Sequence, residues 1–344
     1  AKLLFISQSG GYLNVVDIYP NARKYIILAA IDTWGENSFE VEQVKRAWSA
    51  VGVYSEFMDW WNSEYILFYP NMIDVSQTWT NSRYIYGDLI INSGVTLIIH
   101  DTVFLDTCQI YIQPGGKLII DGGILTSACD GKMWQGIIVG GNPNDTTQSE
   151  SMQGVVELKN GAKIENAICA INLGLKDTTI SKSYDFKGGG IVKATNASFI
   201  NNKKAVEFGP YNRHTKKGTV TVNRNASYFK LCTFKVDNNA LFNLNEFIQH
   251  VNLVEVREVT FEGCSFESIN HTGSAIQSLS SGFILRDYSL GLINGIRSTI
   301  SNFNTAIQIK DGGTKASTIN NTTFEDNNIG ILAEGTDAIY IQSD

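Results

Sequence analysis

Charged side chains are scarce in this sequence, and acidic residues outnumber basic ones. Asp, Glu, Lys and Arg make up 18% of the 344 residues, compared with roughly 25% in an average globular domain, and the formal net charge is -7. A nucleic-acid-binding surface requires concentrated Lys and Arg. The composition therefore argues against a nucleic-acid partner.

Long hydrophobic segments are also missing. The longest candidate, Tyr25–Ile31, is far shorter than the roughly 18 residues that a membrane-spanning helix needs. We therefore expect no membrane span. The sequence shows no signal peptide and opens at Ala1 rather than Met, so we expect a processed, trimmed or internally started product.

Cysteine pairs of the CxxC type are absent, which argues against a zinc site or a redox motif. The five cysteines are Cys108, Cys129, Cys169, Cys232 and Cys264. Cys232 and Cys264 each stand two residues before a Phe, a spacing that puts both side chains on the same face of a strand as that Phe. They predict either a buried row of free thiols or a disulfide between neighbouring coils, whose spacing of about 4.8 Å permits one.

Helical spacing of apolar residues is absent from residue 85 onward, and a different register repeats there. A large apolar residue is followed six positions later by Gly or Ala and seven positions later by an aliphatic residue. The occurrences are Ile164 with Ala170-Ile171, Phe199 with Ala205-Val206, Phe234 with Ala240-Leu241, Phe266 with Ala275-Ile276 after three looped-out residues, Ile300 with Ala306-Ile307, and Phe324 with Gly330-Ile331. The leading residues are 35, 35, 32, 34 and 24 positions apart. A repeat of this size predicts a stack of similar coils.

Each repeat combines short alternating apolar stretches with Asn, Gly, Ser and Thr, which is typical of strands joined by tight turns. An Asn three or four positions after the leading residue suits a tight bend, because Asn tolerates left-handed backbone angles and can bond its own backbone. We predict an all-β fold, a right-handed parallel β-helix with three faces per coil. Polar or Gly-rich insertions at residues 142–153, 176–187, 210–218 and 287–294 are expected to form outward loops, which solenoids usually place on one side.

Residues 1–80 differ from the rest and contain five of the six Trp. Residues 38–51 predict an amphipathic helix capped by Ser38, and Tyr25–Ala30 predicts a strand. We expect a small Trp-rich α/β domain, or a segment that caps the first coil, followed by the β-helix at residues 81–344. Because a strand-like segment immediately precedes Asp344, we expect the β-helix to be truncated there or to continue past this residue.

Several motifs from Trp79 onward resemble a known family. They are Pro114 to Gly123, Ala128-Cys129, Met133 to Ile137, Gly161 to Ala167, Gly189 to Val192 and Phe199 to Phe208. Together they resemble the large secreted parallel β-helix proteins of Bacteroidetes, many of which carry a C-terminal type IX secretion sorting domain. The resemblance implies an extracellular or surface-displayed protein that meets a secretion machinery. No sorting domain is recognisable in this sequence.

Catalytic motifs are missing as well. Pectin-type hydrolases of the β-helix fold use clustered Asp residues, a Gly-His-Gly and an Arg-x-Lys, and none of these occurs. Calcium-dependent lyases need several carboxylates around a cation, whereas the acidic residues here are scattered. We therefore assign no catalytic residue, no metal and no cofactor.

Two patterns indicate binding or modification. Trp60, Trp61 and Trp79 predict either a stacking platform for sugars or the core of a small domain. Thr102, Thr146 and Thr178 each follow an Asp and match a short O-glycosylation pattern associated with Bacteroidetes, although Asp-Thr is also ordinary turn chemistry.

These observations predict a non-catalytic scaffold, secreted or on the outer cell surface, with an adhesive or structural role. Its expected partner is a glycan or a surface protein. One alternative is a polysaccharide lyase or glycoside hydrolase of the parallel β-helix type. Another is a component or passenger of a larger surface assembly.

Overall fold

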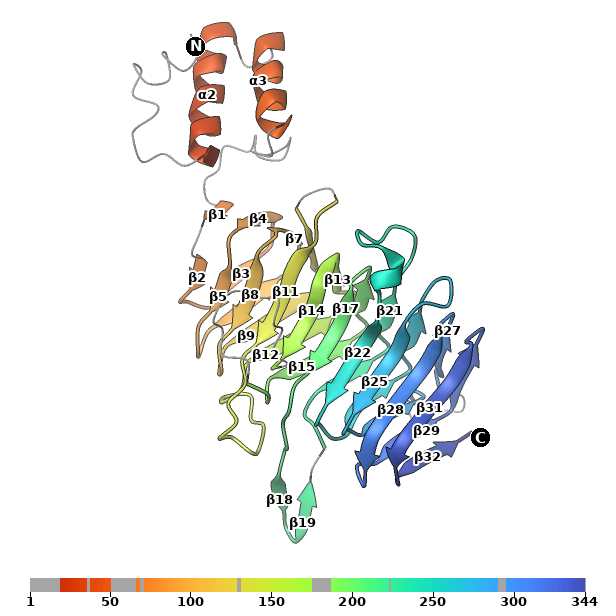
Figure 1. The fold of residues 1–344 in the computed structure, drawn as a ribbon. Coiled ribbons are helices and arrows are strands. Elements are labelled where there is room, and N and C mark those ends of the chain that lie inside the picture. Colours follow the sequence, from red (N-terminus) through yellow and green to blue (C-terminus); the bar gives the residue numbers. More distant parts are fainter. Residues whose placement is uncertain are drawn as a thin grey trace. The chain divides into compact units, whose positions relative to one another are not determined.

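The computed structural model describes residues 19–35, 38–50, 66–68, 71–128, 131–174, 187–222, 224–289 and 295–343. The chain divides into two compact units, residues 1–64 and 65–344, and each is described by itself. The second unit starts before residue 81, because the strands within residues 66–79 already form a coil that pairs with the next one. Figure 1 labels the elements of both units.

The described part of the first unit consists of two helices, α2 (Tyr19–Trp34) and α3 (Phe39–Ala50). The predicted helix is confirmed with its cap, since the Val41 amide donates to the Ser38 hydroxyl over 3.3 Å. The predicted strand at Tyr25–Ala30 is wrong, because this stretch lies inside α2. Ile27 and Ala30, three residues apart, lie on one face of this helix and are buried with Val41 of α3. The short apolar run that suggested a strand is thus the buried face of a helix.

The second unit is built from three parallel ten-stranded sheets, which we call A, B and C. Sheet A contains β1 (Ile66–Phe68), β4 (Arg83–Tyr86), β7 (Thr102–Asp106), β10 (Ile124–Ser127), β13 (Lys163–Glu165), β16 (Ser198–Ile200), β21 (Thr233–Lys235), β24 (Ser265–Glu267), β27 (Ser298–Ser301) and β30 (Thr322–Glu325). Sheet B contains β2 (Asn71–Ile73), β5 (Leu89–Ile91), β8 (Gln109–Ile112), β11 (Trp134–Val139), β14 (Ala167–Leu173), β17 (Lys204–Phe208), β22 (Gln249–Val254), β25 (Ser274–Leu279), β28 (Thr305–Gly313) and β31 (Ile329–Thr336). Sheet C contains β3 (Gln77–Trp79), β6 (Thr96–Ile99), β9 (Lys117–Asp121), β12 (Val155–Lys159), β15 (Ile191–Thr195), β20 (Tyr228–Lys230), β23 (Val259–Glu262), β26 (Phe283–Arg286), β29 (Ser317–Asn320) and β32 (Ile339–Gln342).

Each coil contributes one strand to every sheet, so the predicted right-handed parallel β-helix with three faces is confirmed. The leading residues of the sequence register form one continuous row on sheet A: Ile164, Phe199, Phe234, Phe266, Ile300 and Phe324. The residues expected seven positions later form the matching row on sheet B: Ile171, Val206, Val251, Ile276, Ile307 and Ile331. One member of this row differs from the prediction. Its position is occupied by Val251 and not by Leu241, because a loop with a short 3-10 helix (Leu244–Glu246) is inserted after β21.

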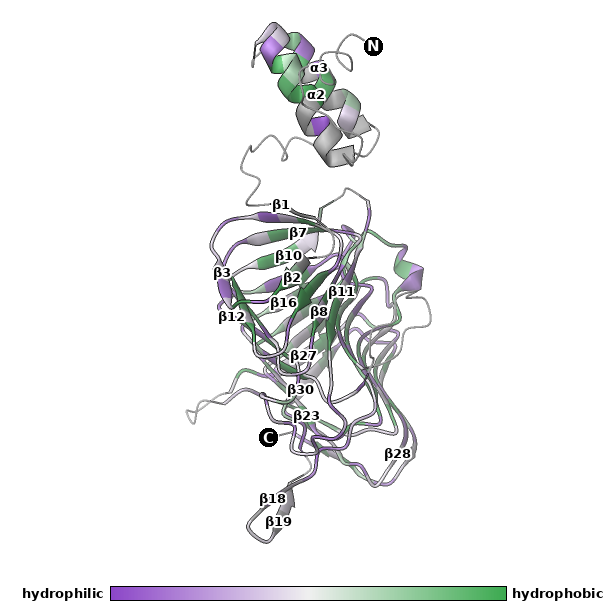
Figure 2. Ribbon diagram, turned by 90° about the vertical axis from the view of Figure 1, so that its left-hand side faces the viewer, coloured by the Kyte–Doolittle hydropathy of each residue, from purple (hydrophilic) through white to green (hydrophobic). Residues whose placement is uncertain are grey.

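The interior of the coil stack is a single apolar core (Figure 2). Phe199, Phe234 and Phe266 stack with ring centroids 4.8 Å and 4.6 Å apart. Beside this row, Cys232 and Cys264 are buried thiols with no disulfide, which confirms the free-thiol interpretation of the small-residue row. Stacking of like rings in successive coils explains why Phe recurs at three consecutive positions of this row.

The corner between sheets A and B uses two polar positions in succession. Asn166, Asn201 and Asn302, two positions after a leading residue, have left-handed backbones with φ of 60°, 52° and 64°. One position later, buried Asn202 accepts a hydrogen bond from the Ala167 amide and donates to the Ile164 carbonyl, both at 2.9 Å. Asn327 repeats this geometry on Phe303 and Ile300. The left-handed bend therefore lies mostly one position earlier than predicted, although Asn270 does have a left-handed backbone, with φ of 55°. The side chains of Asn202 and Asn327 bond the preceding coil instead.

Two described insertions project from the same corner of the coils. Residues 140–154 connect β11 to β12, and residues 209–227 connect β17 to β20 and carry the antiparallel hairpin β18 (Thr215–Lys217) and β19 (Val220–Val222). Both therefore lie between sheets B and C, as Figure 1 shows. The predicted insertions at 176–187 and 287–294 fall largely outside the described residues. In the described part of the chain, no helix has the length and hydropathy needed to cross a membrane.

Candidate functional site

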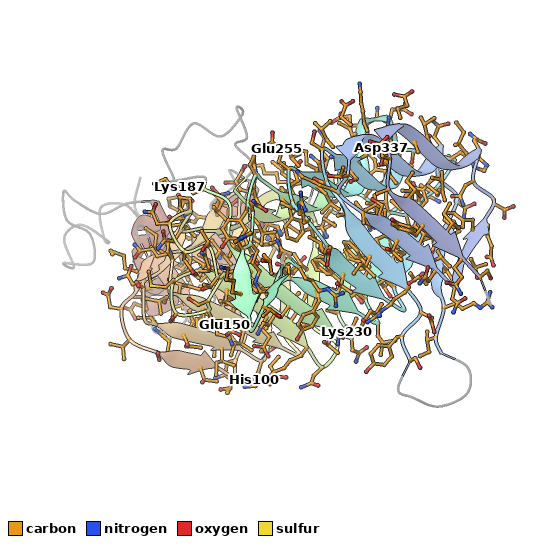
Figure 3. All side chains as sticks on the ribbon, turned by 90° about the horizontal axis from the view of Figure 1, so that it is seen from below. His100, Glu150, Lys187, Lys230, Glu255 and Asp337 are labelled. Atoms are coloured by element: carbon orange, nitrogen blue, oxygen red, sulfur yellow. The ribbon has the colours of Figure 1, made fainter. Side chains whose placement is uncertain are left out.

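One groove among the described residues lies where these insertions meet the corner between sheets B and C. We call it the insertion groove. Its volume is about 650 Å³, and it is lined by Pro143, Thr146, Pro210, Tyr211, Asn212, His214, Glu255, Arg257 and Lys315. In Figure 3, Lys187, Glu255 and Asp337 follow this corner along one edge of the stack, whereas His100 and Lys230 lie at the other edge of sheet C.

The first wall of the groove is the 140–154 loop, which is held by one carboxylate. Asp145 accepts hydrogen bonds from the backbone amide and hydroxyl of Thr147, from the amide and hydroxyl of Ser149, and from the side-chain amide of Gln153. Burial would raise the pKa of Asp145, but these hydrogen bonds outweigh it and lower the pKa to about 2. The fully buried Gln153 also bonds both the amide and the carbonyl of Asn142. The loop is therefore fixed internally, and this carboxylate is already saturated with donors.

A second amide joins the two insertions to each other. Gln148 is buried, and its side-chain nitrogen donates to the Gly189 carbonyl, the Gly190 carbonyl and the Asn225 side chain over 3.1–3.3 Å. Its side-chain oxygen accepts from the Ala226 amide over 2.8 Å. Both the nitrogen and the oxygen of this side chain therefore form hydrogen bonds that link segments up to 78 residues apart in sequence. A buried, fully bonded amide of this kind gives the loops one defined arrangement.

The second wall of the groove is Tyr211, which is anchored at both ends. Its hydroxyl donates to the Asp145 carbonyl, and its amide donates to the Glu255 carbonyl. Gly188 permits this close approach of coils, because a Cβ at this position would lie 2.1 Å from the Pro210 carbonyl oxygen. Burial, and then the charge of Asp145, raise the pKa of Tyr211 to about 12. The phenol therefore remains a neutral, fixed wall.

The floor of the groove carries positive charge. Arg257 and Lys315 come from the corners of two later coils, and the Lys315 ammonium donates to the Ser280 carbonyl. Burial first, and then the neighbouring Arg257 guanidinium, lower the pKa of Lys315, while Glu255 opposes this change. His214, whose amide donates to the Thr146 carbonyl over 2.7 Å, adds an exposed imidazole. The groove thus combines apolar walls, hydroxyl and amide groups, and a cationic floor.

Two smaller grooves have a different character. One, of about 230 Å³ on sheet C, contains Glu262 between Lys230 and Arg286. The other, of about 350 Å³ beside the corner of sheets A and B, contains Asp237 and Glu267. Asp237 is bonded to Asn201 and Asn239, and Glu267 is paired with Lys235. None of the three grooves brings three carboxylates together near an Arg or Lys, and no group of three metal-ligating side chains occurs among the described residues.

Of the residues predicted for sugar stacking, Trp79 lines none of the three grooves. Trp79 has no exposed surface, donates to Gln77 over 2.9 Å and belongs to the core of the coil stack. This core is that of the coil stack and not of the small N-terminal domain that the sequence suggested. Trp60 and Trp61 lie outside the described residues.

The predicted modification sites are dispersed. Thr102 is half-buried at the start of β7, and its amide donates to Asp101 over 2.7 Å. Thr146 is exposed and lines the insertion groove. Thr178 lies outside the described residues. Thr146 lies in a turn, whereas Thr102 begins a strand, and O-glycosylation remains a prediction.

Sequence reasoning identified the insertions but not the cations that they enclose. The sequence predicts outward loops at residues 142–153 and 210–218, and the second of these contains His214. Arg257 and Lys315 sit in short corners without any motif, so no sequence signal marks them. Only the stacking of coils places these residues beside a loop that begins more than one hundred residues earlier.

Comparison with known proteins gives no match, whether with protein-family models, with curated proteins or with solved structures.

Proposed function

We propose that this chain is a secreted or cell-surface β-helix scaffold that binds a glycan in the insertion groove without cleaving it. The observation that carries this proposal is the groove itself, which is preformed by saturated side-chain hydrogen bonds and lined by tyrosine, proline, hydroxyl and amide groups. Apolar faces combined with a few placed polar groups are the usual composition of a small-ligand site. The resemblance to secreted Bacteroidetes β-helix proteins supports an extracellular location. Binding of a glycan there would serve adhesion.

The chemistry of the groove favours binding over hydrolysis. Glycoside hydrolysis generally requires two carboxylates on opposite sides of the scissile bond. The described lining of the insertion groove includes one carboxylate, Glu255. Asp145 lies behind the wall, and its oxygens are occupied by donors of its own loop.

A polysaccharide lyase is the second candidate, and one observation favours it. Proton abstraction from a sugar ring needs a base, and an amine with a lowered pKa can serve as one. Lys315 has this property and lies beside Arg257 in the groove.

A polysaccharide panel separates the two candidates. The purified chain is incubated with labelled polysaccharides, and binding is followed by affinity electrophoresis while products are followed by reducing-end and unsaturated-product assays. The proposal predicts retardation by at least one polysaccharide with no change in its chain length. Formation of unsaturated products by wild type but not by Lys315→Gln would show that the chain is a lyase rather than a non-catalytic scaffold. If no polysaccharide retards the chain, glycan binding is contradicted.

A further inference from the structure

We infer that the insertion groove is selective for acidic polysaccharides and that Arg257 binds their carboxylate or sulfate groups. This inference rests on the proposed glycan binding and specifies its ligand class. It starts from the distribution of ion pairs over the molecule.

Several cations elsewhere on the described β-helix have carboxylate partners. On sheet C, Lys117 pairs with Glu157 over 2.9 Å, Lys159 with Asp121 over 3.5 Å, and Lys230 with Glu262 over 3.4 Å. Close to the groove, Arg224 pairs with Glu258 over 3.3 Å. These charges are balanced by the protein and leave little net attraction for an anion.

Arg257 is different. It is half-buried on the groove floor, and no described carboxylate lies within ion-pair distance of its guanidinium. The groove also contains a second cation, Lys315, whose pKa is lowered partly by Arg257, and one carboxylate, Glu255, which opposes that shift. A guanidinium placed beside an ammonium is electrostatically unfavourable until an anion enters between them. Planar oxyanions match the guanidinium fork in a bidentate geometry.

The walls select a saccharide rather than a bare anion. Pro143, Pro210 and the ring of Tyr211 provide apolar surface, while Thr146 and Asn212 provide hydroxyl and amide groups. Sugars present the same combination of apolar ring faces and hydroxyl groups. Because the whole chain has a formal charge of -7, attraction of an anion requires a local cationic site such as this one.

Matched ligands and variants test the inference. Polygalacturonate is compared with its methyl ester, which has the same sugars without charge, with dextran sulfate, with neutral dextran and with polyglutamate, which has carboxylates without sugars. Wild-type chain should bind polygalacturonate, dextran sulfate or both, and more weakly as salt rises. Arg257→Gln should weaken that binding about tenfold or more, since a charge-assisted contact is lost. Arg224→Gln is the matched control and should leave it unchanged, and thermal unfolding of both variants verifies the fold.

The results separate this inference from the proposed function. Binding of polygalacturonate or dextran sulfate that is reduced in Arg257→Gln but not in Arg224→Gln supports it. Equal binding of the methyl ester, equal binding of polyglutamate, or no effect of Arg257→Gln overturns it while leaving glycan binding intact. If no polysaccharide binds, the proposed function itself fails.

Discussion

His250 is a titratable side chain enclosed by aromatic rings. It is buried between Phe247, with ring centroids 4.8 Å apart, and Phe303 at 5.7 Å, and one ring nitrogen lies 3.0 Å from the Glu267 carbonyl oxygen. Burial lowers the pKa of His250 to about 4. A lowered pKa means that the unfolded chain takes up a proton first as the pH falls. The stability that neutral His250 contributes is therefore complete above its ordinary pKa and is lost as the pH falls towards 4.

We predict that His250→Gln flattens this part of the pH dependence of stability. For wild type, the His250 contribution to the free energy of unfolding should fall by about 3 kcal/mol between pH values near 7 and near 4. Urea denaturation across this range measures the difference between the two proteins. The exposed His271→Gln serves as control and should follow wild type. If the free energy of unfolding depends on pH in the same way for wild type and His250→Gln, the attribution of this pH dependence to His250 is contradicted.

At the scale of the element, the asparagine at the corner of sheets A and B joins consecutive coils. Asn202→Ala would remove one acceptor and one donor and leave the Ala167 amide and the Ile164 carbonyl without these bonds in a buried corner. We expect a loss of about 2 kcal/mol in the free energy of unfolding. Asn238→Ala, at an exposed site of a neighbouring loop, should change stability by less than about 0.5 kcal/mol. Chemical denaturation of both variants tests this, and equal losses would rule out the role of Asn202.

Strand β11 contains a second element-scale constraint. At Gly136 the pairing with β14 shifts register, φ is +110°, and an added Cβ would lie 1.6 Å from the Cys169 carbonyl oxygen. Gly161 also has a positive φ, +83°, but its Cβ position is open. We predict that Gly161→Ala costs about 1 kcal/mol, through backbone strain alone, whereas Gly136→Ala costs more than about 3 kcal/mol. Denaturation midpoints compare the two variants. Similar losses of stability would show that the close approach of Gly136 to the Cys169 carbonyl oxygen does not exclude a side chain.

At the scale of the whole molecule, the fold was predictable from sequence because stacking repeats the same environment in every coil. Phe199, Phe234 and Phe266 occupy equivalent positions in successive coils, so their spacing in the sequence predicts the coil stack. The prediction failed where one coil departs from the others, as at Leu241, where an inserted loop shifts the register to Val251. It also failed in α2, where six apolar residues fit a strand and a helix equally well.

The groove was only half predictable for a related reason. Loop composition marked the insertions, but the partners that they meet depend on which coils stack beside them. Gln148 reaches Asn225, and Thr146 shares the groove with Lys315, across separations that no local pattern encodes. A single cation in a short corner, such as Arg257, can be recognised as part of a groove only from the folded structure.

Hydrogen exchange of the intact chain, with and without the polysaccharide that it binds most tightly, tests the central claim most directly. The account predicts slower amide exchange in residues 142–153, 209–222 and 255–258 on binding, with the polysaccharide recovered at its original length. Protection confined to the face of sheet C or to the corner of sheets A and B, or recovery of shortened polysaccharide, would contradict it.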